Sequence, residues 1–216
     1  MNASVSSQIA AVGMLPVITI DGVERAEQLG HALVRGGLPV VEITFRTAAA
    51  ASAIAIIRMA LPDMLIGAGT VLTREALRAA KDAGADFALA PGTNRDILAE
   101  AREIGIPFFP GVCTPSDIEA ALSMGARILK FFPAEAEGGI EKLETVAAPY
   151  AGERLKFIPT GGIKSASLAT YLASDVVVAV GGSWIASRNM IAEERWSEIS
   201  GAAAEAVAVT RKMRPN

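Results

Sequence analysis

Lys130 stands inside an apolar run, Ile128 to Pro133. Such a run is typical of a buried strand that ends at a proline. Burying a charged amine costs free energy, so desolvation favours the neutral form, and a neutral lysine is the nucleophile that forms Schiff bases with carbonyl compounds. Two interpretations follow from this run. Lys130 is such a nucleophile, or it reaches water at the strand end or neutralises a buried carboxylate.

A second polar set stands in an otherwise apolar stretch, Val41-Glu42-Ile43-Thr44-Phe45-Arg46. Side chains alternate between the two faces of a strand, so Glu42, Thr44 and Arg46 are predicted to share one face. A carboxylate can move protons for a neighbouring nucleophile. An arginine suits a substrate carboxylate because its planar fork can donate two parallel hydrogen bonds. This stretch is therefore predicted to place a carboxylate and an arginine on one strand face.

Two glycine pairs follow apolar runs later in the chain, in Thr160-Gly161-Gly162 and in Gly181-Gly182-Ser183. Backbone N–H groups in such turns suit a phosphate dianion, as does the start of a short helix. A single Gly-Gly pair could be an ordinary turn, whereas two in consecutive turns are more specific. Earlier, Gly67-Ala68-Gly69-Thr70 is predicted to let a ligand approach the backbone, because glycine has no side chain.

The elements that must position these residues alternate regularly along the chain. Strands are predicted for residues 14–20, 38–44, 65–69, 87–90, 106–109, 128–132, 156–159 and 176–180. Helices are predicted between and after them, with a short leading helix at residues 4–11 capped by Ser4 or Ser6. Thr73, and then Asn94 or Thr93, are expected to cap later helices. Short apolar strands alternating with helices are typical of a parallel sheet covered on both faces.

Eight such units most economically close into a (β/α)8 TIM barrel of the α/β class. An open doubly wound sheet is the alternative, but no GxGxxG motif follows the first strand. In a barrel, the active site lies at the C-terminal ends of the strands, and alternate strands share a layer of inward side chains. Glu42 on the second strand and Lys130 on the sixth can therefore meet. They form either a structural ion pair or a nucleophile with its proton shuttle, and their position at the strand ends favours the second.

Composition limits the classes of function. The 216 residues are 51% hydrophobic, which suits one domain over residues 1–216. A formal net charge of −3 gives no reason to expect a nucleic-acid or anionic-membrane partner. No apolar run reaches the roughly 18 residues of a membrane span, and no signal-peptide pattern opens the chain. With one cysteine, Cys113, and hence no disulfide within the chain, a cytoplasmic protein is expected.

The scarcity of metal ligands restricts the chemistry further. The sequence has one histidine, His31, in a helical stretch where a surface or packing role is expected. Zinc sites built by protein side chains usually need several His or Cys ligands, so no zinc site is expected, although a carboxylate magnesium site stays open. Trp184 and Trp196 are expected to pack in the core or an interface.

Several motifs together make the chain resemble the 2-keto-3-deoxy-6-phosphogluconate (KDPG) aldolases, from about Leu15 to about Ile185. The motifs are Gly37 to Thr47, Gly67 to Leu72, Pro91-Gly92, Lys130 to Glu135, Pro159 to Ile163 and Gly181 to Trp184. The resemblance implies a class I aldolase without metal or other cofactor, working as a homotrimer. Its small-molecule substrate would be a phosphorylated keto acid, split into pyruvate and glyceraldehyde 3-phosphate. Bacterial members often also cleave 4-hydroxy-2-oxoglutarate.

The resemblance also implies roles for individual residues. Lys130 would form the Schiff base with the C2 carbonyl, and Glu42 would be the general acid and base. The pyruvyl part of the substrate would be bound by Arg46, Thr70, Pro91 and Phe132. The 6-phosphate would be bound by Thr160, Gly161, Gly162, Gly182 and Ser183.

Alternatives stay open beside this reading. A related 2-keto-3-deoxy-6-phosphogalactonate aldolase is one, although the motifs after the fourth, sixth and seventh strands favour the gluconate branch. A phosphosugar isomerase or epimerase would need a carboxylate pair or metal ligands, for which only Glu42 and Glu135 are at hand. A non-catalytic phosphosugar-binding barrel would not need Lys130, Glu42 and Arg46 together.

Overall fold

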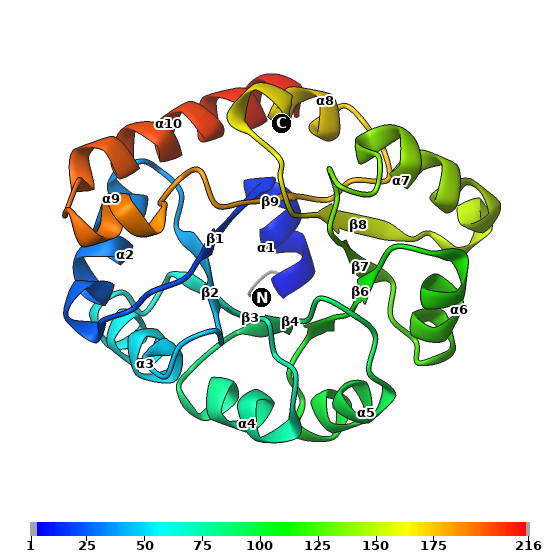
Figure 1. Ribbon diagram of the computed structural model, residues 1–216, viewed down its shortest axis with the longest axis horizontal. Helices are drawn as coiled ribbons and strands as arrows, with labels where there is room; N and C mark the ends of the chain where they lie inside the picture. The colour runs from blue at the N-terminus through cyan, green and yellow to red at the C-terminus, as the bar shows by residue number, and fades with distance from the viewer. Residues whose placement is uncertain (1–3, 215–216) are drawn as a thin grey trace.

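The computed structural model describes residues 4–214. Within them, short parallel strands curl into a barrel, and helices surround it (Figure 1). Every strand pair is parallel, and each strand position is followed by helix, as the buried-sheet pattern requires. The predicted TIM-barrel fold is therefore confirmed. Residues 1–3 and 215–216, which the single-domain prediction includes, lie outside the described residues.

The element bounds are as follows. The strands are β1 (Met14–Ile18), β2 (Val40–Thr44), β3 (Leu65–Gly69), β4 (Phe87–Leu89), β5 (Phe108–Phe109), β6 (Gly111–Val112), β7 (Ile128–Phe131), β8 (Lys156–Pro159) and β9 (Val180–Gly182). The α-helices are α1 (Val5–Val12), α2 (Ala26–Arg35), α3 (Ala50–Ala60), α4 (Arg74–Asp82), α5 (Arg95–Ile104), α6 (Pro115–Ser123), α7 (Gly139–Ala147), α8 (Leu168–Leu172), α9 (Arg188–Ala192) and α10 (Trp196–Met213). Three 3-10 helices, η1 (Val23–Arg25), η2 (Ala148–Glu153) and η3 (Ser165–Ser167), lie among them.

Helix starts follow the capping residues that the sequence contains. The side-chain oxygens of Ser4, Thr73 and Asn94 accept hydrogen bonds from backbone N–H groups in the first turns of α1, α4 and α5. Each bond satisfies a donor that the start of a helix would otherwise leave without a partner. Local sequence therefore sets the start of each of these three helices.

The fifth strand position is split in two. The sequence predicts one strand over residues 106–109, but the structure has β5 and β6 separated by Pro110. Proline has no N–H group and cannot donate to a strand ladder, which explains the break. The result is a six-stranded sheet in the order β5-β4-β3-β2-β1-β9 and a three-stranded sheet in the order β6-β7-β8. Two isolated bridges, Phe157–Val177 and Thr160–Gly181, join β8 to the β9 segment and close the barrel.

The prediction for the eighth strand is wrong in position. The valine-rich residues 176–180 were expected to form it, but the strand is Val180–Gly182, which pairs with Met14–Pro16 of β1. Two glycines therefore lie in the strand rather than after it. A Cβ at residue 181 would lie 2.2 Å from Thr160 Oγ1, and one at residue 182 would lie 1.9 Å from the Trp184 ring. Neighbouring side chains thus leave room only for glycine at these two positions, although glycine has a poor strand propensity.

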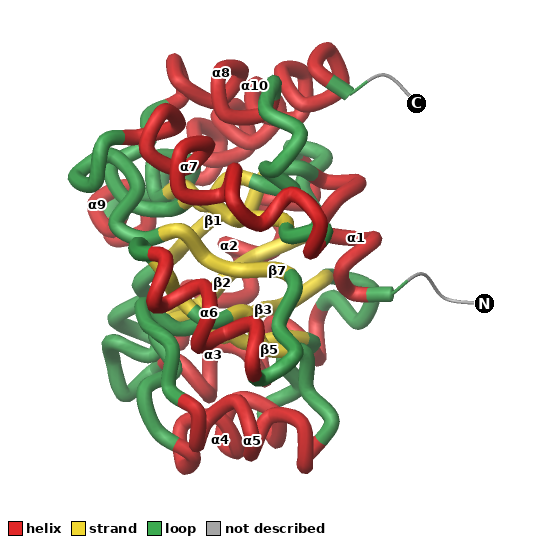
Figure 2. The backbone as a smooth tube through the Cα atoms, turned by 90° about the vertical axis from the view of Figure 1, so that its right-hand side faces the viewer, coloured by secondary structure: helices red, strands yellow, loops and turns green. Residues whose placement is uncertain are grey.

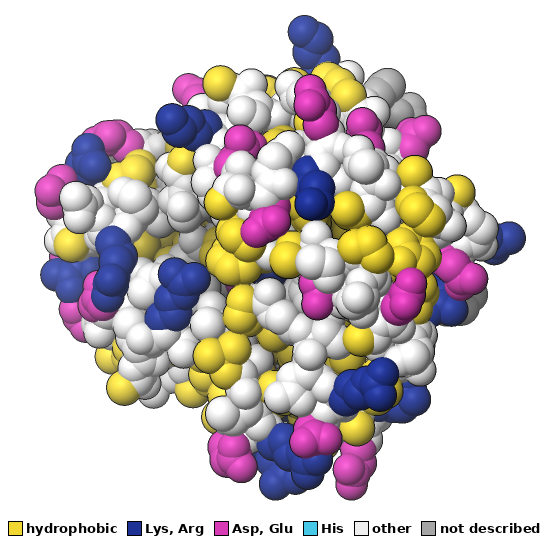
Figure 3. Space-filling model, turned by 45° about the vertical axis from the view of Figure 1, so that its right-hand side comes forward, with side chains coloured by type: hydrophobic (Ala, Val, Ile, Leu, Met, Phe, Trp, Pro, Cys, Tyr) yellow, Lys and Arg dark blue, Asp and Glu magenta, His cyan; other side chains and the backbone are white. Residues whose placement is uncertain are grey.

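On the face shown in Figure 3, Lys and Arg side chains are interspersed with Asp and Glu side chains. Among the helices of residues 4–214, none combines the length and the apolar character needed to cross a bilayer.

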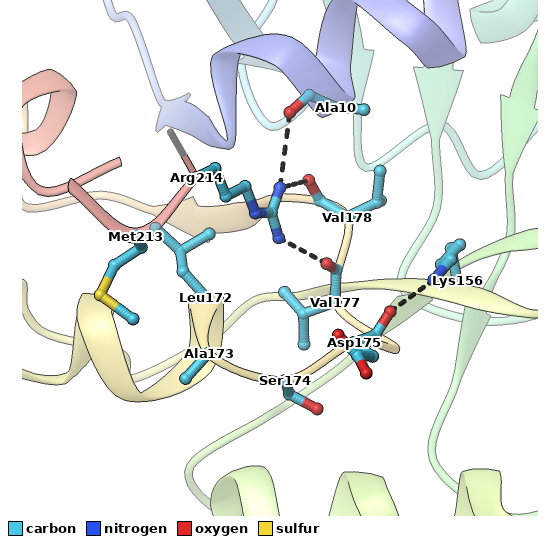
Figure 4. A pocket seen from close by; sticks show the side chains of 10 residues that line it. All are labelled: Ala10, Lys156, Leu172, Ala173, Ser174, Asp175, Val177, Val178, Met213 and Arg214. Carbon is cyan, nitrogen blue, oxygen red and sulfur yellow. Dashed lines mark hydrogen bonds between the residues drawn. The ribbon is translucent and has the colours of Figure 1, made fainter. Parts of the chain in front are cut away.

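The two ends of the barrel differ. Helix α1 lies across the end at which the strands begin, and it is visible through the barrel in Figure 1 and at the right of the barrel in Figure 2. Arg214, which follows α10, connects helix α1 to the segment before β9 at this end of the barrel (Figure 4). Its guanidinium donates to the backbone carbonyls of Ala10 (3.4 Å), Val177 (2.6 Å) and Val178 (2.6 Å). The opposite end, at which the strands finish, carries the polar residues singled out in the sequence.

Candidate active site

A buried ion pair lies inside the barrel. Lys130 Nζ on β7 donates to Glu42 Oε1 on β2 across 3.0 Å, and the two side chains are 5% and 0% exposed. The predicted meeting of these two residues is therefore confirmed. Glu42 Oε2 is also buried, and it has no hydrogen-bond partner among the described residues. A buried carboxylate oxygen without a partner is costly, and such groups are concentrated at functional sites.

Gly69, at the end of β3, makes room for this pair. A Cβ at this position would lie 2.0 Å from Glu42 Oε1, closer than any side-chain contact permits. Next to it, Thr70 has a φ of 56°, a left-handed conformation that is uncommon for a β-branched residue. Strained backbone of this kind is concentrated at functional sites. The sequence predicts close approach of a ligand at this turn, and the structure shows close approach of the Glu42 carboxylate.

A cavity of about 510 Å³ opens above the ion pair, where the strands end. Most of the predicted site residues line it together: Arg46, Thr70, Lys130, Phe132, Thr160, Gly161, Gly162, Gly182 and Ser183. Thr44, which shares the strand face of Arg46, lines it as well. The Phe132 ring lies beside the lysine, with its centroid 5.7 Å from Lys130 Nζ. The wall therefore combines the Lys130 amine with hydroxyl groups, backbone groups and an arginine.

Two of the predicted residues do not line this cavity. Glu42 lies inside the barrel, in contact with Lys130 but not among the lining residues. Pro91, at the end of β4, packs against Gly111, where a Cβ would lie 2.1 Å from the Pro91 carbonyl carbon. The structure thus does not bring Pro91 together with Arg46 and Thr70 at the cavity.

Gly181, which belongs to the second glycine pair, also lines the cavity. Lining residues that the sequence did not single out for the site are Val17, Thr19, Ile163, Lys164, Trp184 and Ser187. Trp184 was expected in the core or an interface, but it is half-buried in the cavity wall above Gly182. Thr19 forms a 2.8 Å hydrogen bond with Thr44, and Thr44 in turn donates to the Ile18 carbonyl. These residues lie at or just beyond strand ends, and that position was the one sequence signal available for them.

The two glycines after β8 are held in a fixed turn. Gly161 and Gly162 have φ of 105° and 80°, which favour glycine. The loop after β7 pairs with this turn, because Glu135 N–H donates to the Gly161 carbonyl across 3.0 Å. Tyr171 donates to Glu135 Oε1 across 2.8 Å. Burial of Tyr171 is the main cause that raises the pKa of its hydroxyl, and the bond to Glu135 raises it further. The turn is therefore supported by a buried tyrosine rather than left loose.

Charge in the cavity has one sign. Three basic side chains line it, those of Arg46, Lys130 and Lys164, and no acidic side chain of the described residues does. Such a cavity suits an anionic ligand. In residues 4–214, no three His, Cys, Asp or Glu side chains gather as a metal site would require. His31 lies away from the cavity on α2, 3.7 Å from Glu27.

Comparison with known proteins adds independent evidence. A family model for KDPG and KHG aldolase matches residues 5–202. A 2-dehydro-3-deoxy-phosphogluconate aldolase of Haemophilus influenzae is 42% identical over 198 residues, which cover 92% of each chain. A KHG/KDPG aldolase of Escherichia coli K12 is 38% identical over 204 residues, 94% of this chain and 95% of that one.

A solved structure of similar shape is the KDPG aldolase of Legionella pneumophila. It has a TM-score of 0.88 and 39% identity, and the match covers 94% of this chain and 97% of that one. In that structure, pyruvate was captured at low pH as a covalent carbinolamine intermediate. The family model, the curated relatives and this structure agree over nearly the whole chain. The protein therefore belongs to the family of KDPG and KHG aldolases.

Proposed function

We propose that this chain is a class I aldolase that cleaves KDPG into pyruvate and glyceraldehyde 3-phosphate. It also cleaves 4-hydroxy-2-oxoglutarate into pyruvate and glyoxylate, the bifunctionality named for its relative in Escherichia coli. The observation that carries the proposal is the buried Lys130 amine, 3.0 Å from Glu42 at the floor of a cationic cavity. An amine held in an apolar barrel beside a proton carrier is equipped for iminium chemistry.

The first half of the reaction joins substrate to enzyme. Glu42 accepts a proton from the Lys130 ammonium group, the neutral nitrogen attacks C2 of the keto acid, and a proton passes from that nitrogen to the carbonyl oxygen to give a carbinolamine. Glu42 then delivers a proton to the departing hydroxyl, water leaves, and an iminium remains between Lys130 and C2. The iminium is a far better electron sink than the ketone, so it prepares the neighbouring bond for cleavage.

The second half breaks the carbon–carbon bond. Glu42 accepts the proton of the C4 hydroxyl, the C3–C4 electrons move into the iminium, and C4 leaves as the aldehyde. The enamine that remains takes a proton at C3, and water adds to C2 to release pyruvate and restore the lysine. One carboxylate carries protons in both halves, as general acid–base catalysis permits.

Binding of the two anionic ends is divided between the two sides of the cavity. Arg46 and Thr70, after neighbouring strands β2 and β3, bind the pyruvyl carboxylate, and Phe132 provides an apolar wall. The turn of Thr160, Gly161 and Gly162, together with Gly182 and Ser183, binds the 6-phosphate through backbone N–H and hydroxyl groups. A contribution of Pro91 stays a prediction.

Three further expectations belong to this proposal. The chain works as one domain, it assembles as a homotrimer, and it needs no metal or other cofactor. We also propose a cytoplasmic location, since a reducing compartment suits a chain with a single cysteine.

The test is borohydride trapping with pyruvate in the presence of a metal chelator, followed by peptide mapping. The expected result is a reduced pyruvyl adduct on Lys130. Lys130→Met should form no adduct and lose KDPG cleavage, while Lys156→Met, which replaces an exposed lysine of β8, should behave as wild type. Absence of an adduct on folded wild-type protein would exclude the class I mechanism. Circular dichroism of Lys130→Met separates lost chemistry from lost folding, because its Glu42 would lie buried without a cationic partner.

A further inference from the structure

Lys164 lines the active-site cavity, yet neither the family match nor the proposed roles give it a function. It follows the Gly161-Gly162 turn and precedes η3. The side chain is exposed and makes no hydrogen bond or ion pair with any described residue. Its charge is therefore available to a ligand at the phosphate side of the cavity.

The other basic side chains near the cavity either have an acidic partner or lie away from the glycine turn. Lys130 is paired with Glu42. Arg188, which follows the lining residue Ser187, is paired with Asp21 through two hydrogen bonds. Arg46 lies after β2, and two strands, β1 and β9, separate β2 from β8. Lys164 is thus the lining cation that stands beside the glycine turn with its charge uncompensated.

Local structure gives Lys164 no role of its own. It occupies the N-cap position of η3, where Ser, Thr, Asp or Asn is favoured because such a side chain accepts a hydrogen bond. Lysine has no acceptor, and no side-chain capping bond forms here. A positive charge at a helix start is also unfavourable. Arg25 and Arg195 occupy the N-cap positions of α2 and α10 in the same way, also without a capping bond. The Lys164 side chain therefore has no local bond that would keep it from a ligand.

We propose that Lys164 is a specificity-determining residue that binds the substrate phosphate and favours the phosphorylated substrate over 4-hydroxy-2-oxoglutarate. The inference rests on the proposed function, because it assigns one end of the same substrate. KDPG carries its phosphate at C6, beyond the reacting C3–C4 bond, whereas 4-hydroxy-2-oxoglutarate ends at a C5 carboxylate. An ammonium group beside the glycine turn therefore meets the longer substrate only.

The test compares Lys164→Asn, which removes the charge and supplies a capping side chain, with Lys164→Arg, which keeps the charge. For Lys164→Asn we expect KM for KDPG to rise about fivefold, the size of a solvent-exposed charge interaction. Its kcat for KDPG and both constants for 4-hydroxy-2-oxoglutarate should stay within twofold of wild type. Its unfolding midpoint should be unchanged or raised. Lys164→Arg should keep the low KM, and Lys81→Gln, an equal loss of charge on the outer helix α4, should match wild type.

Salt provides a second readout, because exposed charges are screened. The KM difference between wild type and Lys164→Asn should shrink as ionic strength rises. Equal losses on both substrates, a lowered unfolding midpoint or unchanged KDPG kinetics would each overturn the assignment. If wild-type protein cleaved neither substrate, the proposed function itself would fail. If it cleaved both and Lys164→Asn matched Lys81→Gln, the role of Lys164 alone would fail.

Discussion

At the scale of single residues, the two oxygens of Glu42 have different surroundings. One accepts the Lys130 hydrogen bond, and the other is buried without a partner among the described residues. A purely structural ion pair gains from having both oxygens bonded, because a buried acceptor left unsatisfied costs about 1–3 kcal/mol. The second oxygen thus has no structural bond that a proton-transfer role would have to break.

Glu42→Gln tests whether the Glu42 carboxylate transfers protons. The amide keeps the size of the side chain and an oxygen for Lys130, but it cannot accept and return a proton. We expect kcat for KDPG cleavage to fall by about 10²–10⁴-fold with a much smaller change in KM. Steady-state kinetics on protein with unchanged circular dichroism provides the measurement. A wild-type rate would reduce Glu42 to an ion-pair partner.

Gly69→Ala tests the space that this carboxylate needs. The new Cβ would lie 2.0 Å from Oε1 and 2.7 Å from Cδ of Glu42, so the side chain must move away from Lys130. We expect a large loss of kcat/KM and a loss of about 1–3 kcal/mol in the free energy of unfolding. The matched control is Gly201→Ala in α10, where a Cβ meets open space and should stabilise the helix by up to about 1 kcal/mol. Full activity of Gly69→Ala would show that the pair tolerates displacement.

At the scale of elements, the sequence predicts what local chemistry controls. The caps at Ser4, Thr73 and Asn94 lie where expected because capping depends on one side chain and its own helix. The position of the eighth strand was missed because Thr160 and Trp184, outside the strand, decide that glycines belong in it. Tertiary packing of this kind leaves no local signal.

Helix α6 offers a test of capping with a pH dependence. Asp117 Oδ2 accepts hydrogen bonds from the backbone N–H groups of Cys113 (3.0 Å) and Thr114 (2.9 Å). Burial raises the pKa of this carboxyl, but the bonds from Cys113 and Thr114 outweigh it, so the pKa lies below its ordinary value. The carboxylate therefore stabilises the fold above the unfolded-state pKa of about 4, and this contribution is lost as pH falls through the folded-state pKa.

Asp117→Ala should accordingly lower the free energy of unfolding by about 1 kcal/mol at pH 7. The difference from wild type should narrow as the pH is lowered toward 3. Urea unfolding at several pH values measures it, with Asp82→Ala at the exposed end of α4 as the control for loss of charge. A difference that is constant with pH would show that packing, and not the ionised cap, is responsible.

At the scale of the whole molecule, Arg214 connects the end of the chain to its beginning. Its guanidinium donates to carbonyls of α1 and of the segment before β9, at the barrel end opposite the cavity. Arg214→Met should cost about 2 kcal/mol, since the carbonyls lose a charged donor. For a chain of this size, the unfolding midpoint should fall by about 4–8 °C.

The activity of Arg214→Met well below that midpoint should match wild type, because the cavity lies at the other end. Arg211→Met, one turn earlier and exposed, makes no side-chain bond with a described residue and serves as the control. Scanning calorimetry and KDPG kinetics on both variants provide the comparison. Equal midpoints for the two variants would rule out the stabilising role of Arg214.

The barrel rule predicts the centre of the site better than its rim. Glu42 and Lys130 could be paired from the sequence because strand parity fixes which inward side chains share a layer. Lys164 and Ser187 could not be predicted, since the path of a loop decides whether its side chains face the cavity. Pro91 was singled out through the family resemblance; its backbone lies against Gly111, and its contribution to the site stays a prediction.

The division of the barrel into two sheets has a mechanical consequence. Glu42 belongs to the six-stranded sheet and Lys130 to the three-stranded one, and the sheets are joined at Pro110 and at two isolated bridges. The 3.0 Å contact between Lys130 Nζ and Glu42 Oε1 therefore crosses from one sheet to the other. Any movement of the six-stranded sheet relative to the three-stranded sheet would change this distance. A substitution that loosens either junction between the two sheets should therefore also disturb the geometry proposed for the reaction.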